Sequence, residues 1–168
     1  MPRRLLERCQ LDSVGEFRAA ALQRYQDGLS LAAAGRRTGA IYLWGYTAEM
    51  VLKAAFFSFA GLAERDTITW ALHLKPAISK GVSLGISWPS PGAGHNVRAW
   101  AELLVLERAA APAAAYTPAF GLEVQRQGQR LEWLWRETLR YHKNIAYPHE
   151  VMRAREAAEW LLTNSHLL

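Results

Sequence analysis

The chain has 168 residues, of which 51% are hydrophobic and 21% are charged, and its formal net charge at pH 7 is +5. This is the composition of an ordinary globular protein, and we expect a single domain over 1–168 with its core at about 13–163. The single cysteine, Cys9, excludes an internal disulfide and a cysteine-based metal site, which fits a reducing cytoplasm. The mild positive charge permits a polyanionic partner such as RNA without requiring one.

Two long helices are predicted in the first third of the chain. Ser13 and Glu16 form a capping box, and apolar residues then recur at helical spacing to about Ala34. Thr38 is the expected N-cap of the second helix, and Gly61 is its expected end. Because only a few residues join the two helices, we expect them to pack antiparallel.

The second of these helices is apolar almost all the way round, which indicates a buried central position. It nevertheless contains an acid and a base, Glu49 and Lys53, whose spacing of four residues places them on one face in the favourable order. Two interpretations are open. The pair is either a partly exposed helix pair worth about 0.3–0.5 kcal/mol, or a partly buried pair beside a groove or a subunit contact.

A membrane-spanning role for this helix is disfavoured. The segment 38–63 is long enough to span a bilayer, but Glu49 and Lys53 would lie near its centre at a cost of roughly 2.5–3.5 kcal/mol each. The N-terminal residues contain arginines but no long apolar run, so they do not form a secretory signal. We therefore expect no association with a membrane.

The middle of the chain is less regular. Asp66 is expected to cap a helix over 67–74, which Pro76 then disturbs. Residues 80–96 contain four glycines and two prolines, which predict an irregular loop. Asn96 is the expected cap of the helix that follows.

Two more helices are predicted toward the C-terminus. One spans roughly 120–143, with leucines on one side and basic residues on the other. Residues 144–148 break the pattern, and the last helix spans about 149–163. Since no convincing strand pattern is present in the sequence, the prediction is an all-α, up-and-down bundle of five to six helices.

The candidate chemistry lies in the stretch 135–150, WRETLRYHKNIAYPHE. Arginine holds phosphate through a planar fork of donors, and histidine transfers protons near neutral pH, so together they could cleave RNA without a metal. Three pairings are open: Arg136 with His142, Arg140 with His149, and Lys143 with His149. The alternative is that the arginines form a solvated helix face and that His149 merely begins the next helix. The scattered histidines and the missing phosphate loop lead us to expect no metal and no cofactor.

The remaining candidates fall into two groups. The basic side of the 120–143 helix and the break after it supply candidate contacts to nucleic acid or a nucleotide, namely Arg126, Arg130, Asn144 and Tyr147. A groove or subunit seam is expected to involve Glu49, Lys53, Tyr46 and His95.

The segment TGAIYLWGYTAEMVLKAAFF, residues 38–57, resembles the second helix of HEPN-domain proteins, the higher eukaryote and prokaryote nucleotide-binding family. The residues that match its typical run are Leu43, Gly45, Tyr46, Glu49, Leu52, Lys53 and Ala54. The likeness continues to about residue 162. It implies a helical bundle, often a homodimer with a groove at the subunit seam. Many HEPN proteins are metal-independent ribonucleases, commonly toxins or defence proteins, and some pair with a small nucleotidyltransferase.

The family's catalytic signature is an arginine followed by a polar residue and, a few residues later, by a histidine. By context the match is Lys143-Asn144 with His149, where lysine stands in the place of arginine. By residue type the match is Arg136 with His142. Arg140-Tyr141 is similar to the Arg-Tyr of relatives without a clear nuclease signature. The resemblance therefore implies a ribonuclease, a silent HEPN protein that contacts nucleic acid or a nucleotidyltransferase, or a structural adaptor.

Overall fold

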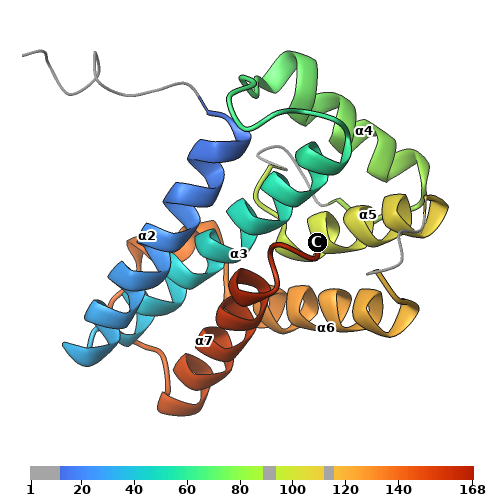
Figure 1. The fold of residues 1–168 in the computed structure, drawn as a ribbon. Helices are drawn as coiled ribbons and strands as arrows, with labels where there is room; N and C mark the ends of the chain where they lie inside the picture. Colours follow the sequence, from blue (N-terminus) through green and yellow to red (C-terminus); the bar gives the residue numbers. More distant parts are fainter. Residues whose placement is uncertain (1–11, 89–93, 112–115) are drawn as a thin grey trace, which may run out of the picture.

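The computed structural model describes residues 12–88, 94–111 and 116–168. Over these ranges the chain forms six α-helices and no strand, which confirms the predicted all-α bundle (Figure 1). The α-helices are α2 (Val14–Ala33), α3 (Arg37–Phe59), α4 (Lys75–Ser83), α5 (Val97–Ala110), α6 (Pro118–Leu134) and α7 (Pro148–Thr163). A π-helix, η1 (Trp70–Leu74), precedes α4, and a 3-10 helix, η2 (Glu137–Tyr141), follows α6. None of the described helices is both long and apolar enough to cross a membrane.

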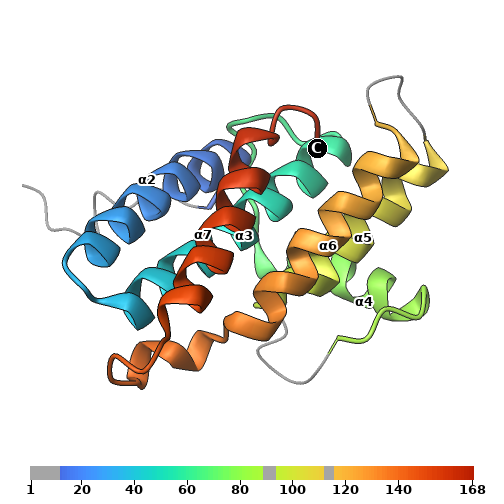
Figure 2. The same cartoon turned by 90° about the horizontal axis from the view of Figure 1, so that it is seen from below.

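Helix α3 is the centre of the molecule, as its apolar sequence predicts. It packs against α2, α5 and α7, and α2 lies antiparallel to it (Figures 1 and 2). Trp44 and Leu52 of α3 and Trp100 of α5 are completely buried. Helices α5 and α6 form a second pair that runs at an angle to α2 and α3 (Figure 1).

Helix α3 carries a glycine where a tryptophan ring from another element meets its backbone. A Cβ on Gly45 would lie 2.0 Å from the ring of Trp135, which is closer than any real contact. The indole N–H of Trp135 donates to the carbonyl of Tyr42 over 2.9 Å. The absence of a side chain at position 45 therefore lets Trp135 seat directly on α3 and remain buried.

The predicted long helix over 120–143 is wrong, because α6 ends at Leu134. Trp135 and Arg136 have extended backbones, and the short helix η2 follows them. The extended pair redirects the chain so that the Trp135 ring reaches α3. Burial of this large ring therefore overrides a local pattern that favours a continuous helix.

The helix expected over 67–74 is also different in the structure. The carboxylate of Asp66 accepts from the backbone N–H of Ala63 over 2.7 Å, within the turn that precedes the expected helix. Thr69 caps η1 instead, and its hydroxyl accepts from the N–H of Leu72 over 3.3 Å. Pro76 lies in the first turn of α4, directly after η1, and Leu74 and Lys75 both have helical backbones. The helical run therefore continues through Pro76, but it changes there from π to α geometry.

Helix α4 extends to Ser83, into the stretch predicted as an irregular loop over 80–96. The irregular part therefore begins only at Leu84, and Gly85 adopts a left-handed conformation with φ of 84°. Residues 89–93 of this loop lie outside the described residues. Asn96 caps α5 as predicted, with its side chain accepting from the N–H of Ala99 over 2.8 Å.

The start of α3 is capped from the opposite end of the chain. Thr38 lies in the first turn of the helix and is not its N-cap. The side-chain oxygen of Asn144 accepts from the N–H of Thr38 over 3.1 Å, and its amide donates to the carbonyl of Gly35 over 2.8 Å. The Thr38 hydroxyl in turn accepts from the N–H groups of Ile145 and Ala146, at 2.8 and 3.0 Å. These bonds hold the 144–146 turn against α3.

Candidate functional site

Three ionisable side chains meet at a pocket of about 520 Å³ on one side of α3. They are Glu49 and Lys53 of α3 and His95, which lies just before α5. Tyr46, Trp70 and Glu137 are among the other residues that line the pocket. The sequence predicted Glu49, Lys53, Tyr46 and His95 as residues of a groove or subunit seam, and the structure brings these four residues together at one pocket.

The Glu49 carboxylate has two basic partners although it is only 2% exposed. The Lys53 ammonium, itself 6% exposed, donates to Oε1 of Glu49. The Nδ1 atom of His95 lies 3.0 Å from Oε2 and 3.1 Å from Oε1 of the same carboxylate. Of the two interpretations of the Glu49–Lys53 pair, the buried one is therefore correct. Burying charges is costly even when they are paired, so this cluster is poorly explained by stability alone.

The turn before α5 aims His95 at α3. Asn96 caps the helix immediately after His95, and the Trp100 indole donates to the carbonyl of Gly94 over 3.0 Å. The Trp100 ring also lies 5.6 Å from the Lys53 ammonium, an arrangement that favours the charged lysine. The residues on both sides of His95 are thus anchored, which orients its ring toward Glu49.

Aromatic rings form the wall behind the charged groups. The ring of Tyr46 meets His95 edge to face, with centroids 5.8 Å apart, and meets Trp135 in the same way at 5.3 Å. Burial raises the pKa of Tyr46, and the nearby Tyr42 hydroxyl raises it further. Tyr46 therefore keeps its proton at neutral pH and can donate a hydrogen bond but cannot serve as a base.

Glu137 is a member of the site that the sequence did not reveal. Its Oε2 lies 4.0 Å from Nε2 of His95, and its Oε1 lies 2.9 Å from the Arg140 guanidinium. The predicted continuous helix over 120–143 concealed its role, because the break after α6 is what carries η2 to the pocket. No local signal around position 137 indicated this placement.

The hydrogen bond with Glu49 raises the pKa of His95 above its usual value of 6.5, and burial offsets this only in part. We expect the His95 ring to titrate above pH 6.5 when followed by NMR of the imidazole carbons. The folded state therefore favours the charged imidazole. The stability contribution of this contact is fully present below about pH 6.5 and is lost as the pH rises through the pKa of the folded protein.

In a Glu49→Gln variant the pKa of His95 should fall, because the carboxylate that stabilises the imidazolium is gone. A pKa of His95 that stays below 6.5 in the wild type, or one that does not respond to Glu49→Gln, would contradict the described contact.

The predicted arginine–histidine pairs are not joined in the part of the chain that the structure describes. Arg136 donates to the Trp135 carbonyl over 3.0 Å, and Arg140 is paired with Glu137. His142 and Lys143 are exposed. The ring of His149 is stacked on that of Tyr147, with centroids 5.8 Å apart and planes inclined by 7°.

The predicted nucleic-acid contacts have local partners. Arg126 pairs with Glu123 over 2.6 Å, and Arg130 donates to Gln127 over 3.3 Å. Asn144 holds the start of α3, and Tyr147 is exposed at the start of α7. The charge of Arg126 is thus partly neutralised on the helix surface, whereas Arg130 is held only by a neutral amide.

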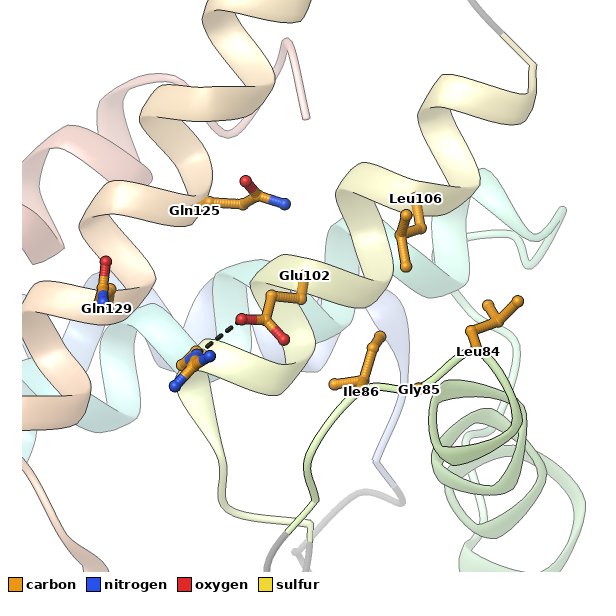
Figure 3. A pocket seen from close by; sticks show the side chains of 8 residues that line it. Leu84, Gly85, Ile86, Glu102, Leu106, Gln125 and Gln129 are labelled. Carbon is orange, nitrogen blue, oxygen red and sulfur yellow. Dashed lines mark hydrogen bonds and ion pairs between the residues drawn. The ribbon is translucent and has the colours of Figure 1, made fainter.

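A second pocket, of about 340 Å³, lies between α5, α6 and the chain after α4 (Figure 3). Its charged groups satisfy each other, because Arg98 lies 2.6 Å from Glu102 and 3.4 Å from Glu132. In Figure 3, Gln125 of α6 points toward the space between α5 and α6. No histidine is among the described residues that line it, so it is less suited to acid–base chemistry than the pocket at His95.

The His95 pocket therefore combines the His95 imidazole, the carboxylates of Glu49 and Glu137, and the buried ammonium of Lys53. Together these groups can move protons and stabilise negative charge. Among the residues with described positions, no group of three or more histidine, cysteine or acidic side chains is arranged to hold a metal ion. No protein-family model, curated protein or solved structure matches the chain. The residues of the pocket are thus the basis of any functional argument.

Proposed function

We propose that the protein has a nucleotide- or RNA-linked role, and that the His95 pocket cleaves RNA without a metal. The observation that carries this proposal is the buried Glu49 carboxylate, which holds Lys53 and His95 together at a pocket of about 520 Å³. Paired charges at the wall of a pocket are typical of functional sites, since an apolar core would be built more cheaply without them.

The pocket supplies the groups that transesterification of RNA needs. Glu137 must move away from Nε2 of His95, now 4.0 Å from it, so that the phosphate can lie between the two groups. Glu137 then takes the proton of the 2′-hydroxyl, and the 2′-oxygen forms a bond to phosphorus. The bond from phosphorus to the 5′-oxygen breaks as Nε2 of the protonated His95 gives its proton to that oxygen. The products are a 2′,3′-cyclic phosphate and a 5′-hydroxyl. Lys53 places positive charge beside the phosphorane that forms between these steps.

The exposed side chains that follow Glu137 in the chain favour an unpaired nucleic-acid strand. Tyr141 and Tyr147 are 74% and 64% exposed, and the Arg140 guanidinium lies 4.7 Å from the centroid of the Tyr141 ring. Lys143 is exposed between the two tyrosines. Exposed aromatic rings interleaved with cations bind single-stranded RNA by stacking and by charge.

The resemblance to HEPN proteins supports the same proposal, because Gly45, Glu49 and Lys53 are among the matching residues. By extension we propose a homodimer with its seam near the pocket, and a toxin–antitoxin or defence role in which a nucleotidyltransferase is a candidate partner. A catalytically silent binding protein is the second candidate. It is favoured by the carboxylates of Asp12, Glu49 and Glu137 at the pocket, which oppose the approach of a phosphate.

The deciding experiment is RNA cleavage in EDTA, followed on gels with a panel of unstructured RNAs. We expect the wild type to cleave and to leave 2′,3′-cyclic phosphate ends. His95→Gln should lower the rate about 100-fold or more, because it removes the general acid. Glu137→Gln should also lower it, because the base is lost.

His166→Gln is the matched control and should cleave like the wild type, since His166 lies away from the pocket. The variants His142→Gln and His149→Gln discriminate between sites. Loss of cleavage in either of these, with His95→Gln active, would return the chemistry to the 136–149 stretch. A wild type that binds RNA but does not cleave it would support the silent binding protein, and cleavage that requires a divalent metal would exclude the mechanism.

A further inference from the structure

A third pocket, of about 400 Å³, lies between the end of α5 and the start of α6. Its walls are mainly apolar and include Val105, Ala109 and Leu122. Leu122 is 63% exposed, so the pocket opens beside an apolar residue that the protein itself does not cover. Pockets of this size and character are suited to small organic ligands.

Two residues in the wall of this pocket have polar atoms without a hydrogen-bond partner in the part of the chain that the structure describes. Tyr116 is only 8% exposed, and its hydroxyl is buried without a hydrogen bond. The Nε atom of Arg108 is likewise buried and unpaired. Buried polar groups are nearly always hydrogen-bonded, and an unpaired one requires an explanation.

The space beside the Tyr116 hydroxyl depends on Gly121. A Cβ at position 121 would lie 3.4 Å from the hydroxyl and 3.3 Å from a methyl group of Val105. Glycine at this position leaves room for little more than a methyl group beside the hydroxyl, which itself is buried behind the lining of the pocket. Burial raises the pKa of Tyr116 to about 12, so the hydroxyl is protonated at neutral pH and is available as a donor.

Arg108 gives this end of the pocket its charge. Its guanidinium lies 4.7 Å from the centroid of the Phe59 ring and 5.4 Å from that of Tyr116, and it donates to the carbonyl of Leu168. No side-chain carboxylate pairs with it among the residues that the structure places. A cation and a donor hydroxyl at the end of an apolar pocket are complementary to an anionic acceptor.

We propose that this pocket binds a small amphipathic carboxylate, with its apolar body against Val105 and Leu122 and its carboxylate toward Tyr116 and Arg108. The site is separate from the His95 pocket and does not depend on the proposed ribonuclease activity. Because the hydroxyl is buried, this binding mode requires the Tyr116 ring to turn toward the pocket, where the carboxylate supplies the acceptor that the hydroxyl lacks.

The test uses octanoate as the probe, with octan-1-ol as the neutral analogue, and measures binding by NMR shifts of the full chain. We expect octanoate to bind more tightly than octanol and to perturb Val105 and Leu122. Leu122→Asp should abolish binding, because it places a negative charge at the mouth. Leu84→Asp is the matched control, since Leu84 is a 50% exposed leucine on another pocket, and should bind like the wild type.

Tyr116→Phe removes only the hydroxyl and should weaken octanoate binding about tenfold, the effect of one charge-assisted hydrogen bond. Without ligand the same variant should be at least as stable to heat as the wild type, because an unpaired buried group has been removed. Equal affinity for octanoate and octanol, binding that survives Leu122→Asp, no binding at millimolar octanoate, or a less stable ligand-free Tyr116→Phe protein would each overturn the proposal.

Discussion

Replacing Glu49 with leucine is expected to lower the free energy of unfolding by about 3–5 kcal/mol, one of the two largest effects we predict. The substitution leaves the Lys53 ammonium 6% exposed and without its carboxylate. Lys53→Met should cost less, because Glu49 then keeps His95 as a partner. The asymmetry follows from the geometry: the acid has two basic partners, whereas the lysine has one acid.

Urea unfolding followed by circular dichroism measures these losses, and the double variant Glu49→Leu/Lys53→Met completes the cycle. We expect the double variant to recover most of the stability, since a buried ion pair replaced by apolar residues is often neutral. Asp27→Leu is the control, because its pair with Arg24 lies on the surface of α2 and should contribute less than about 1 kcal/mol. A Glu49→Leu protein as stable as the Asp27→Leu protein would show that the pair is solvated.

Replacing Gly45 with alanine is expected to destabilise the protein by about 1–3 kcal/mol or more, the cost of overpacking a core. The added methyl group would lie 2.0 Å from the Trp135 ring, so the ring or the helix must move. The change should also displace η2, because Trp135 immediately precedes it, and with η2 the Glu137 carboxylate at the pocket. We therefore expect both lower stability and a changed titration of His95.

Gly39→Ala is the matched control on the same helix. A Cβ there would lie 3.1 Å from a methyl group of Leu31, which can rotate away, and alanine favours the helix over glycine. This variant should unfold at about the wild-type urea concentration or above it. If Gly45→Ala did the same, the close approach of Trp135 to α3 would be wrong.

The sequence identified α3 and its charged pair because both depend on local spacing. A continuous apolar helix must be buried, and residues four apart must share a face, whatever the rest of the chain does. The caps at Ser13 and Asn96 were predictable for the same reason, since each bonds to an N–H three residues away. The proposal of a groove or subunit seam at Glu49, Lys53, Tyr46 and His95 went beyond this local spacing, because His95 is far from α3 in the sequence.

Tertiary structure decided the features that join distant parts of the chain. The end of α6 at Leu134 depends on the fit of Trp135 against Gly45, and the start of α3 depends on Asn144, which lies 106 residues after Thr38. Neither contact leaves a periodic pattern, because each involves one side chain and one distant backbone. The sequence by itself thus determined an all-α bundle around a buried acid–base pair. The three-dimensional packing alone placed Glu137 beside His95, and it paired Arg140 with Glu137 rather than with a histidine.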